Sequence, residues 1–155
     1  MTDLKLSPPW RNAVKELIDA GLTYGSEITT GEITKLCDLT APTSIDQYET
    51  YKLKLLQCIT EIKEALLKDH QMLLVTNRDS SYRVIKPNEQ TAYAIEHGRK
   101  EISRAMQRMS LQTQFVNQSL LTDSQRRQNA DAQAKISMLS GMNKLSASEL
   151  HQIVA

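Results

Sequence analysis

Aromatic residues and cysteines are scarce in this chain of 155 residues. Aromatic side chains make up 5% of the residues and hydrophobic side chains 40%, so packing depends on Leu, Ile, Val and Met and an aliphatic core is expected. The two cysteines, Cys37 and Cys58, lie in segments that favour helix and have no ligand at metal-binding spacing. We therefore expect buried, reduced thiols and neither a disulfide nor a metal site.

Long apolar segments are also missing. No segment stays apolar over the roughly 20 residues that a membrane-spanning helix needs. The first ten residues, "MTDLKLSPPW", lack the apolar centre of a signal peptide. We therefore expect a cytoplasmic protein that does not enter a membrane.

Residues that commonly carry catalysis are few and scattered. His70, His97 and His151 lie far apart, neither HExxH nor CxxC occurs, and the five glycines form no phosphate-binding loop. We therefore expect no enzyme activity, no cofactor and no metal.

The net charge is small. The whole chain carries +1; residues 1–90 contain 11 basic and 13 acidic side chains, whereas residues 91–155 contain 8 and 5. A balance of this kind supplies no overall field that would attract nucleic acid. Any contact with DNA must therefore come from local patches.

Apolar periodicity predicts helices over most of the chain. A first helix is predicted over about residues 8–20, and the stretch "SEIT" at residues 26–29 favours a short extended segment. A second helix is predicted over about residues 30–37, because Thr29 and Glu32 have the spacing of a capping box.

The strongest periodic signal predicts a long third helix that starts at Ser44 or Asp46 and ends near Asp69. The stretch "VTNRDSSYRVIKP", residues 75–87, alternates on both sides of a polar tip and stops at proline, which predicts a β-hairpin. The apolar residues of the third helix recur every three or four positions and are predicted to face the core: Tyr48, Tyr51, Leu55, Ile59, Ile62 and Leu66.

The sequence after residue 87 returns to helix. Helices are predicted over about residues 88–111 and 123–140, with Gly141 ending the second of them before a short final helix. Capping-box spacings recur in Thr122 with Gln125 and in Ser146 with Glu149. In the first of these helices Ile95, Ile102, Met106 and Met109 are predicted to face inward.

Two domains are predicted, one over residues 1–87 and a helical extension over residues 88–155. The tail after residue 111 is rich in Gln, Ser, Asn and Ala, and has too few large apolar residues to bury a core of its own. Packing against the fourth helix or against a second copy would supply the missing burial, and of the two we expect association into a homodimer. A core position or a dimer seam is expected for Met106, Met109, Phe115, Val116, Leu120 and Leu121.

Helix, short strand, helix, turn, helix and hairpin is the order of elements in a winged helix. The stretch "RDSSYR", Arg78 to Arg83, resembles the wing of response-regulator effector domains, whose pattern is Arg, Gly, any residue, Gly, Tyr, Arg. Arg78, Tyr82 and Arg83 match this pattern, while Asp79 and Ser81 stand where the family has glycines.

The resemblance implies a mainly α fold with a small β-hairpin: a winged helix over about residues 9–87, followed by a C-terminal helical extension. It also implies DNA binding. A helical tail on a winged helix is similar to what small bacterial and phage-encoded regulatory or accessory proteins show.

One face of the third helix carries side chains that suit base edges in a major groove, because glutamine and lysine can bond to adenine and guanine. The alternative is a solvated face, since Asp46, Glu49 and Glu61 nearby would repel phosphates. The candidate DNA-binding residues are Gln47, Thr50, Lys54 and Gln57 in the helix, with Arg78 and Arg83 in the hairpin.

A second basic stripe lies in the fourth helix. Lys100, Arg104 and Arg108 follow His97 at helical spacing, which is suited to contacts with phosphate or with a partner. A solvated face or an inter-subunit salt-bridge surface is the alternative.

These observations lead us to expect a regulatory protein that binds double-stranded DNA through a winged helix and dimerises through its C-terminal helices. The alternative is a protein-interaction module or inhibitor, for example a phage accessory or counter-defence protein, that uses the same scaffold without DNA. The small net charge and the acidic residues beside the third helix motivate this alternative.

Overall fold

The computed structural model describes the backbone of residues 8–154 and the side chains of residues 8–144. The chain forms two compact units, Met1–Thr91 and Ala92–Ala155. All three strands of the described residues belong to the first unit.

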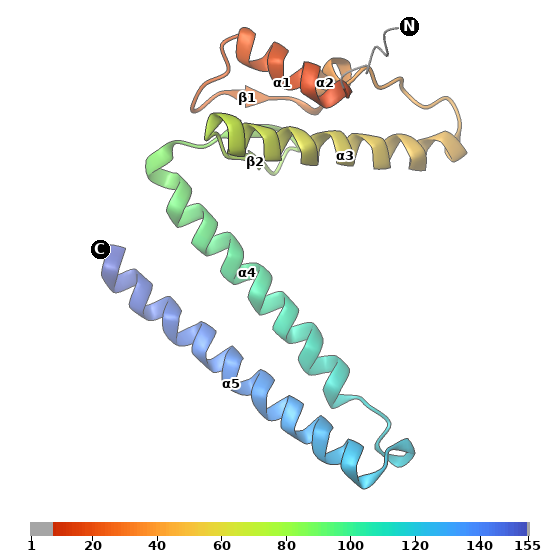
Figure 1. Ribbon diagram of the computed structural model, residues 1–155, viewed down its shortest axis with the longest axis vertical. Coiled ribbons are helices and arrows are strands. Elements are labelled where there is room, and N and C mark those ends of the chain that lie inside the picture. The colour runs from red at the N-terminus through yellow and green to blue at the C-terminus, as the bar shows by residue number, and fades with distance from the viewer. Residues whose placement is uncertain (1–7, 155) are drawn as a thin grey trace, which may run out of the picture. The chain divides into compact units, whose positions relative to one another are not determined.

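The first unit combines helices with short strands (Figure 1). Its elements are α1 (Pro9–Asp19), β1 (Glu27–Ile28), α2 (Thr30–Leu36), α3 (Ile45–His70), β2 (Leu74–Thr76) and β3 (Tyr82–Val84). The strands form one antiparallel sheet in the order β1-β3-β2. The predicted class, mainly α with a small β-hairpin and a helical extension, is confirmed, and both the element order and the strand order are compatible with a winged helix.

Side chains cap the helices at the predicted positions. The Glu32 N–H donates to Thr29 Oγ1 at 3.2 Å, and the Thr29 N–H donates to Glu32 Oε2 at 2.7 Å, so the capping box of α2 is complete. Hydrogen bonds from the Thr29 backbone and side chain hold the pKa of the Glu32 carboxyl below its usual value. At the start of α3 the Ser44 hydroxyl oxygen accepts a bond from the Gln47 N–H.

The core of the first unit lies among the three helices and the sheet. Ile62 and Leu66 of α3 are fully buried there, and so is Val84 of β3. Cys37 is a buried free thiol, while Cys58 is a half-buried one. Burial, and then the neighbouring Cys58 thiol, raise the pKa of Cys37 to about 12, so the group stays protonated.

The predicted apolar stripe of α3 reaches the core over only part of its length. Ile59, Ile62 and Leu66 are buried as expected, but Tyr51 is half-buried and Tyr48 is 55% exposed. The prediction was wrong for Tyr48 because the first turns of α3 extend beyond α1 (Figure 1), and no residue between positions 45 and 54 is buried.

The second unit is an antiparallel helical hairpin (Figure 1). It contains most of α4 (Pro87–Gln114), the short 3-10 helix η1 (Gln118–Leu120) and α5 (Asp123–Val154). The prediction that Ile95, Ile102, Met106 and Met109 face inward was wrong for all but Met106: the other three are exposed, whereas Met106 is half-buried and lines a groove with Ile136 of α5. No residue of α4 is fully buried. A single neighbouring helix leaves much of each side chain uncovered, and Ile102 is 46% exposed.

One long helix replaces the two that were predicted for the tail. The α5 helix continues through Gly141 to Val154, so the predicted stop at this glycine was wrong. A glycine ends a helix when it adopts positive φ, and Gly141 is not among the described residues that do so. The predicted capping box of Ser146 and Glu149 lies outside the described side chains. Among the described residues, no helix has the length and apolar character needed to cross a membrane.

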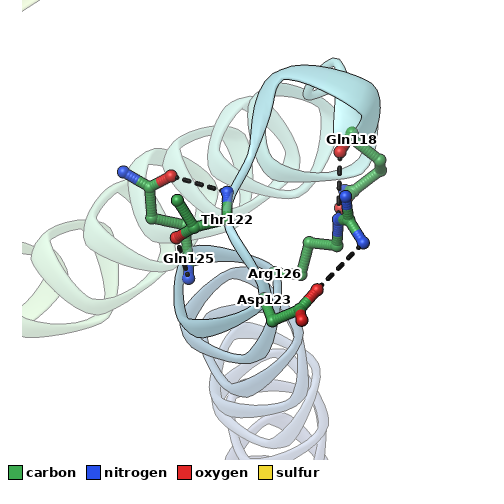
Figure 2. Close-up of polar contacts among 5 residues, drawn as sticks. All are labelled: Gln118, Thr122, Asp123, Gln125 and Arg126. Carbon is green, nitrogen blue, oxygen red and sulfur yellow. Dashed lines mark hydrogen bonds and ion pairs between the residues drawn. The ribbon is translucent and has the colours of Figure 1, made fainter.

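Polar contacts fix the turn of the hairpin (Figure 2). The Thr122 N–H donates to Gln125 Oε1 at 2.9 Å and the Gln125 N–H donates to Thr122 Oγ1 at 3.3 Å, which confirms the predicted capping box. The Arg126 guanidinium donates to the Gln118 carbonyl and to the Asp123 carboxylate, both at 3.1 Å. Arg126 therefore ties the first turn of α5 back to η1.

The contacts between α4 and α5 are also polar. The side-chain amides of Asn129 and Gln133 both donate to the Thr113 carbonyl, at 3.1 and 2.8 Å, and the Asn143 amide donates to the Ser103 hydroxyl at 3.1 Å. Hydrogen bonds of this kind select how the two helices align, but they add little apolar burial.

Candidate nucleic-acid interface

The candidate base-reading residues all lie on the exposed surface of α3. Gln47, Thr50 and Lys54 line one groove of about 480 Å³, between the start of α3 and the loop that joins α2 to it. Gln57 lies one turn further along and does not line this groove. The fold therefore brings three of the four predicted residues together.

Two features of the groove affect how it could contact a nucleic acid. Gln47 Oε1 already accepts hydrogen bonds from the Thr43 N–H and hydroxyl, at 3.2 and 3.0 Å. The carboxylates of Asp38 and Asp46 line the same groove and would repel phosphate. The groove itself is therefore suited to hydrogen-bond donors, and Thr50, Lys54 and Gln57 are better placed than Gln47 to reach base edges.

The hairpin tip is a tight, internally bonded turn. The Asn77 N–H donates to the Ser81 carbonyl at 2.8 Å, and the Ser80 N–H donates to the Asn77 carbonyl at 3.2 Å. Asp79 Oδ1 accepts bonds from the Ser81 N–H and hydroxyl, and these bonds hold the pKa of Asp79 below its usual value.

Positive φ occurs at Ser80, with a value of +66°, and not at Asp79 or Ser81, the two positions where the response-regulator pattern has glycine. Asp79 and Ser81 therefore adopt backbone conformations that any residue can take. The hairpin forms a tight turn because its left-handed residue, Ser80, lies between these two positions.

A chain of threonine hydroxyls connects the hairpin tip with α2 and α3. The Thr30 hydroxyl donates to the Ser80 carbonyl at 2.6 Å. One turn later, the Thr34 hydroxyl donates to the Thr30 carbonyl at 2.8 Å and lies 3.4 Å from the Tyr51 hydroxyl of α3. One side of α2 thus holds both the wing and the projecting part of α3.

The two wing arginines have different environments. Arg78 is exposed at the tip of the hairpin, whereas Arg83 is half-buried in β3 and lies opposite Glu27 of β1. Opposite charges at such a cross-strand position attract each other. Arg78 is therefore the better placed of the two for a phosphate.

Lys63 is a further cation beside the hairpin, and the sequence reasoning missed it. Its ammonium donates to Thr76 Oγ1 at 2.9 Å and lies 5.1 Å from the centre of the Tyr82 ring. Burial lowers the pKa of Lys63. The local sequence does not predict that Lys63 lies beside the hairpin, because α3, β2 and β3 come together only in the folded protein.

The second basic stripe is partly neutralised within α4. Lys100 pairs with Glu96 at 2.6 Å and Arg104 pairs with Glu101 at 3.0 Å. Arg108 forms no ion pair with another side chain in residues 8–144. Of the three predicted contacts, Arg108 is therefore the most accessible to an anion.

Comparisons of the chain with protein-family models, with curated proteins and with solved structures find no match. In the described part of the chain, no cluster of three or more His, Cys, Asp or Glu side chains could hold a metal ion. The function must therefore be inferred from the wing, from α3 and from the helical hairpin.

The Thr30 hydroxyl offers a direct test of how the wing is held. Thr30→Val keeps the shape of the side chain but removes the bond to the Ser80 carbonyl, so we expect a loss of about 1 kcal/mol in the free energy of unfolding. Hydrogen exchange at the Asn77 and Ser80 amides should become faster. Thr60→Val serves as the control, because the Thr60 hydroxyl bonds only to the Leu56 carbonyl of its own helix. Unchanged hydrogen exchange at the Asn77 and Ser80 amides in Thr30→Val would show that this bond does not hold the hairpin tip.

Proposed function

We propose that the protein binds double-stranded DNA in a regulatory role, with the exposed face of α3 in the major groove. The observation that carries this proposal is the pair of threonine contacts from α2, through Thr30 to the wing and through Thr34 to α3. These contacts join the hairpin tip, whose backbone carries Arg78, and the first turns of α3 to the same helix. A preorganised pair of contacts loses less conformational entropy when DNA binds.

Each element has a distinct role in this proposal. Thr50, Lys54 and Gln57 bond to base edges, which is where sequence is read. Arg78 contacts a backbone phosphate or the minor groove, which positions the protein but reads no sequence. Arg83 contributes more weakly, because it is half-buried opposite Glu27.

The helical hairpin supports a further part of the proposal, which is dimerisation. No side chain of the hairpin is buried over residues 92–144, and a pair of helices with so little burial is marginal on its own. Ile95, Ile102 and Met109 recur every seven residues along α4, the spacing of a helix-packing seam. We propose that a second copy covers this seam, which places two winged-helix units in one particle that can contact two half-sites.

DNA binding is tested by fluorescence anisotropy on random-sequence duplexes over a series of salt concentrations. We expect binding at low salt, with an affinity that falls steeply as salt increases, because counterions are released from phosphates. Arg78→Ala should reduce the slope of the logarithm of the binding constant against the logarithm of the salt concentration by about 1. Lys54→Ala should instead reduce the difference in affinity between DNA sequences.

Lys135→Ala is the matched control for these variants. Lys135 lies in α5 of the second unit and pairs with Asp131, so its loss removes the same charge from a helix that carries none of the candidate DNA-binding residues. The absence of any binding at low salt would contradict the proposal, because non-specific affinity for phosphates is strongest there.

Dimerisation is tested by light scattering of the full-length chain. We expect a mass of at least twice the single-chain 17.5 kDa, and we expect Ile102→Glu to reduce it, because a charge in the seam opposes burial. Met138→Glu is the control, since Met138 is exposed but lies off the seven-residue seam. A mass near 17.5 kDa for the unaltered chain would contradict dimerisation.

The acidic side of the groove favours a second candidate function, which is binding to a protein. Asp38 and Asp46 line the groove together with Thr50 and Lys54, and these carboxylates would attract a basic segment of a partner. A nuclease-resistant protein complex that Asp46→Lys abolishes and Lys54→Glu preserves would favour this function over DNA binding.

A further inference from the structure

Large apolar side chains are exposed along the first three turns of α3. Ile45 is 88% exposed, Leu53 69%, Tyr48 55% and Leu56 52%. Single exposed apolar residues are ordinary on protein surfaces, but a contiguous group of them marks an interaction site. Base reading by the polar face of α3 does not need these four residues.

Two of these exposed apolar residues, Ile45 and Leu56, lie on one line along the helix. Ile45, Glu49, Lys52 and Leu56 follow one another at intervals of four, three and four, which places them in one row on the helix surface. All four are exposed. We name this row the α3 ridge. At 3.6 residues per turn, Thr50, Lys54 and Gln57 fall on the other side of the helix.

We propose that the α3 ridge packs against the α3 ridge of a second copy of this chain, with the two helices antiparallel. The order of the ridge is apolar, acidic, basic, apolar. Reversed in an antiparallel neighbour, it becomes apolar, basic, acidic, apolar. Ile45 then meets Leu56 of the second copy, and Glu49 meets Lys52 of the second copy.

Charge complementarity is the reason that the occupant is a second copy. A two-fold axis repeats each contact, so one register forms two apolar contacts and two ion pairs at once. The two apolar contacts lie at the ends of the pair, and the two ion pairs lie between them. The opposite face of each α3 stays exposed, so the pairing leaves the candidate base-reading residues accessible.

The pairing surface is small, with four residues from each helix. Interfaces well below the standard size are typical of weak or transient association. We therefore expect the pairing at high protein concentration, in addition to the dimer formed by the helical hairpin. It is independent of the proposed DNA binding.

Cross-linking tests the register directly. Chains carrying Ile45→Cys are mixed with chains carrying Leu56→Cys and oxidised mildly. We expect a disulfide-linked species in the mixture that neither variant forms alone, because like positions would lie roughly 16 Å apart along the helices, too far for a disulfide. Oxidation of the unaltered chain measures the cross-linking that the free cysteines Cys37 and Cys58 produce by themselves. No excess of cross-linking in the mixture over the single variants would overturn the proposal.

Charge reversal provides the second measurement, by sedimentation of the full-length chain over a range of concentrations. Glu49→Lys should weaken the association beyond the hairpin dimer by about tenfold, because symmetry converts two ion pairs into two repulsions. The double variant Glu49→Lys with Lys52→Glu should restore it.

Asp69→Lys is the matched control, because it changes the charge by the same amount at the far end of α3. Ile45→Glu should also weaken the association and leave the helix intact, since an acidic residue suits a first helical turn. If Glu49→Lys leaves the association unchanged, or if the double variant fails to restore it, the antiparallel pairing is wrong. Either result leaves the DNA-binding test unaffected, because the base-reading residues lie on the opposite face.

Discussion

The burial of Ile62 and Leu66 is the contact on which the rest of the first unit depends. Both side chains are fully buried within the core formed by the helices and the sheet. Truncating one such residue typically costs about 2–5 kcal/mol, which is a large fraction of the whole stability of a typical domain, roughly 5–15 kcal/mol. Because the end of α3 is anchored this firmly, its first turns can extend into solvent without any buried residue. The exposed face that we assign to DNA exists only because the core holds the other half of the same helix.

Hydrogen bonds then determine how the parts around this core are oriented. A net contribution of about 1 kcal/mol is typical for one such bond, so the Thr30 and Thr34 contacts add little to the total stability. They do select one position of the wing tip relative to α2 and α3. In the helical hairpin, Asn129, Gln133 and Asn143 align α4 with α5 in the same way. Burial supplies stability in this protein, and polar side chains supply the alignment.

The sequence predicted the features that local chemistry determines. Thr29 with Glu32, and Thr122 with Gln125, mark helix starts because each pair satisfies amides that lie within a few residues. Features that depend on distant elements were not predictable. Periodicity identifies the inward side of α3, but it does not say where along the helix the core ends, so Tyr48 was wrongly placed. Likewise, the surroundings of Lys63 and Arg83 depend on strand pairing, which no short stretch of sequence encodes.

The small net charge of the protein explains why the proposed function needs both of its units. Affinity for DNA is dominated by phosphate contacts. At the proposed interface, Arg83 is half-buried opposite Glu27 and two carboxylates line the α3 groove, which opposes phosphate binding. One copy of the first unit would therefore bind DNA weakly. Linking two such units raises the effective concentration of the second once the first is bound, and the joint affinity can rise by roughly 10²–10⁴ without any new contact. In the proposed dimer, pairing through Ile95, Ile102 and Met109 would thus supply by association the affinity that the surface charge of a single unit lacks.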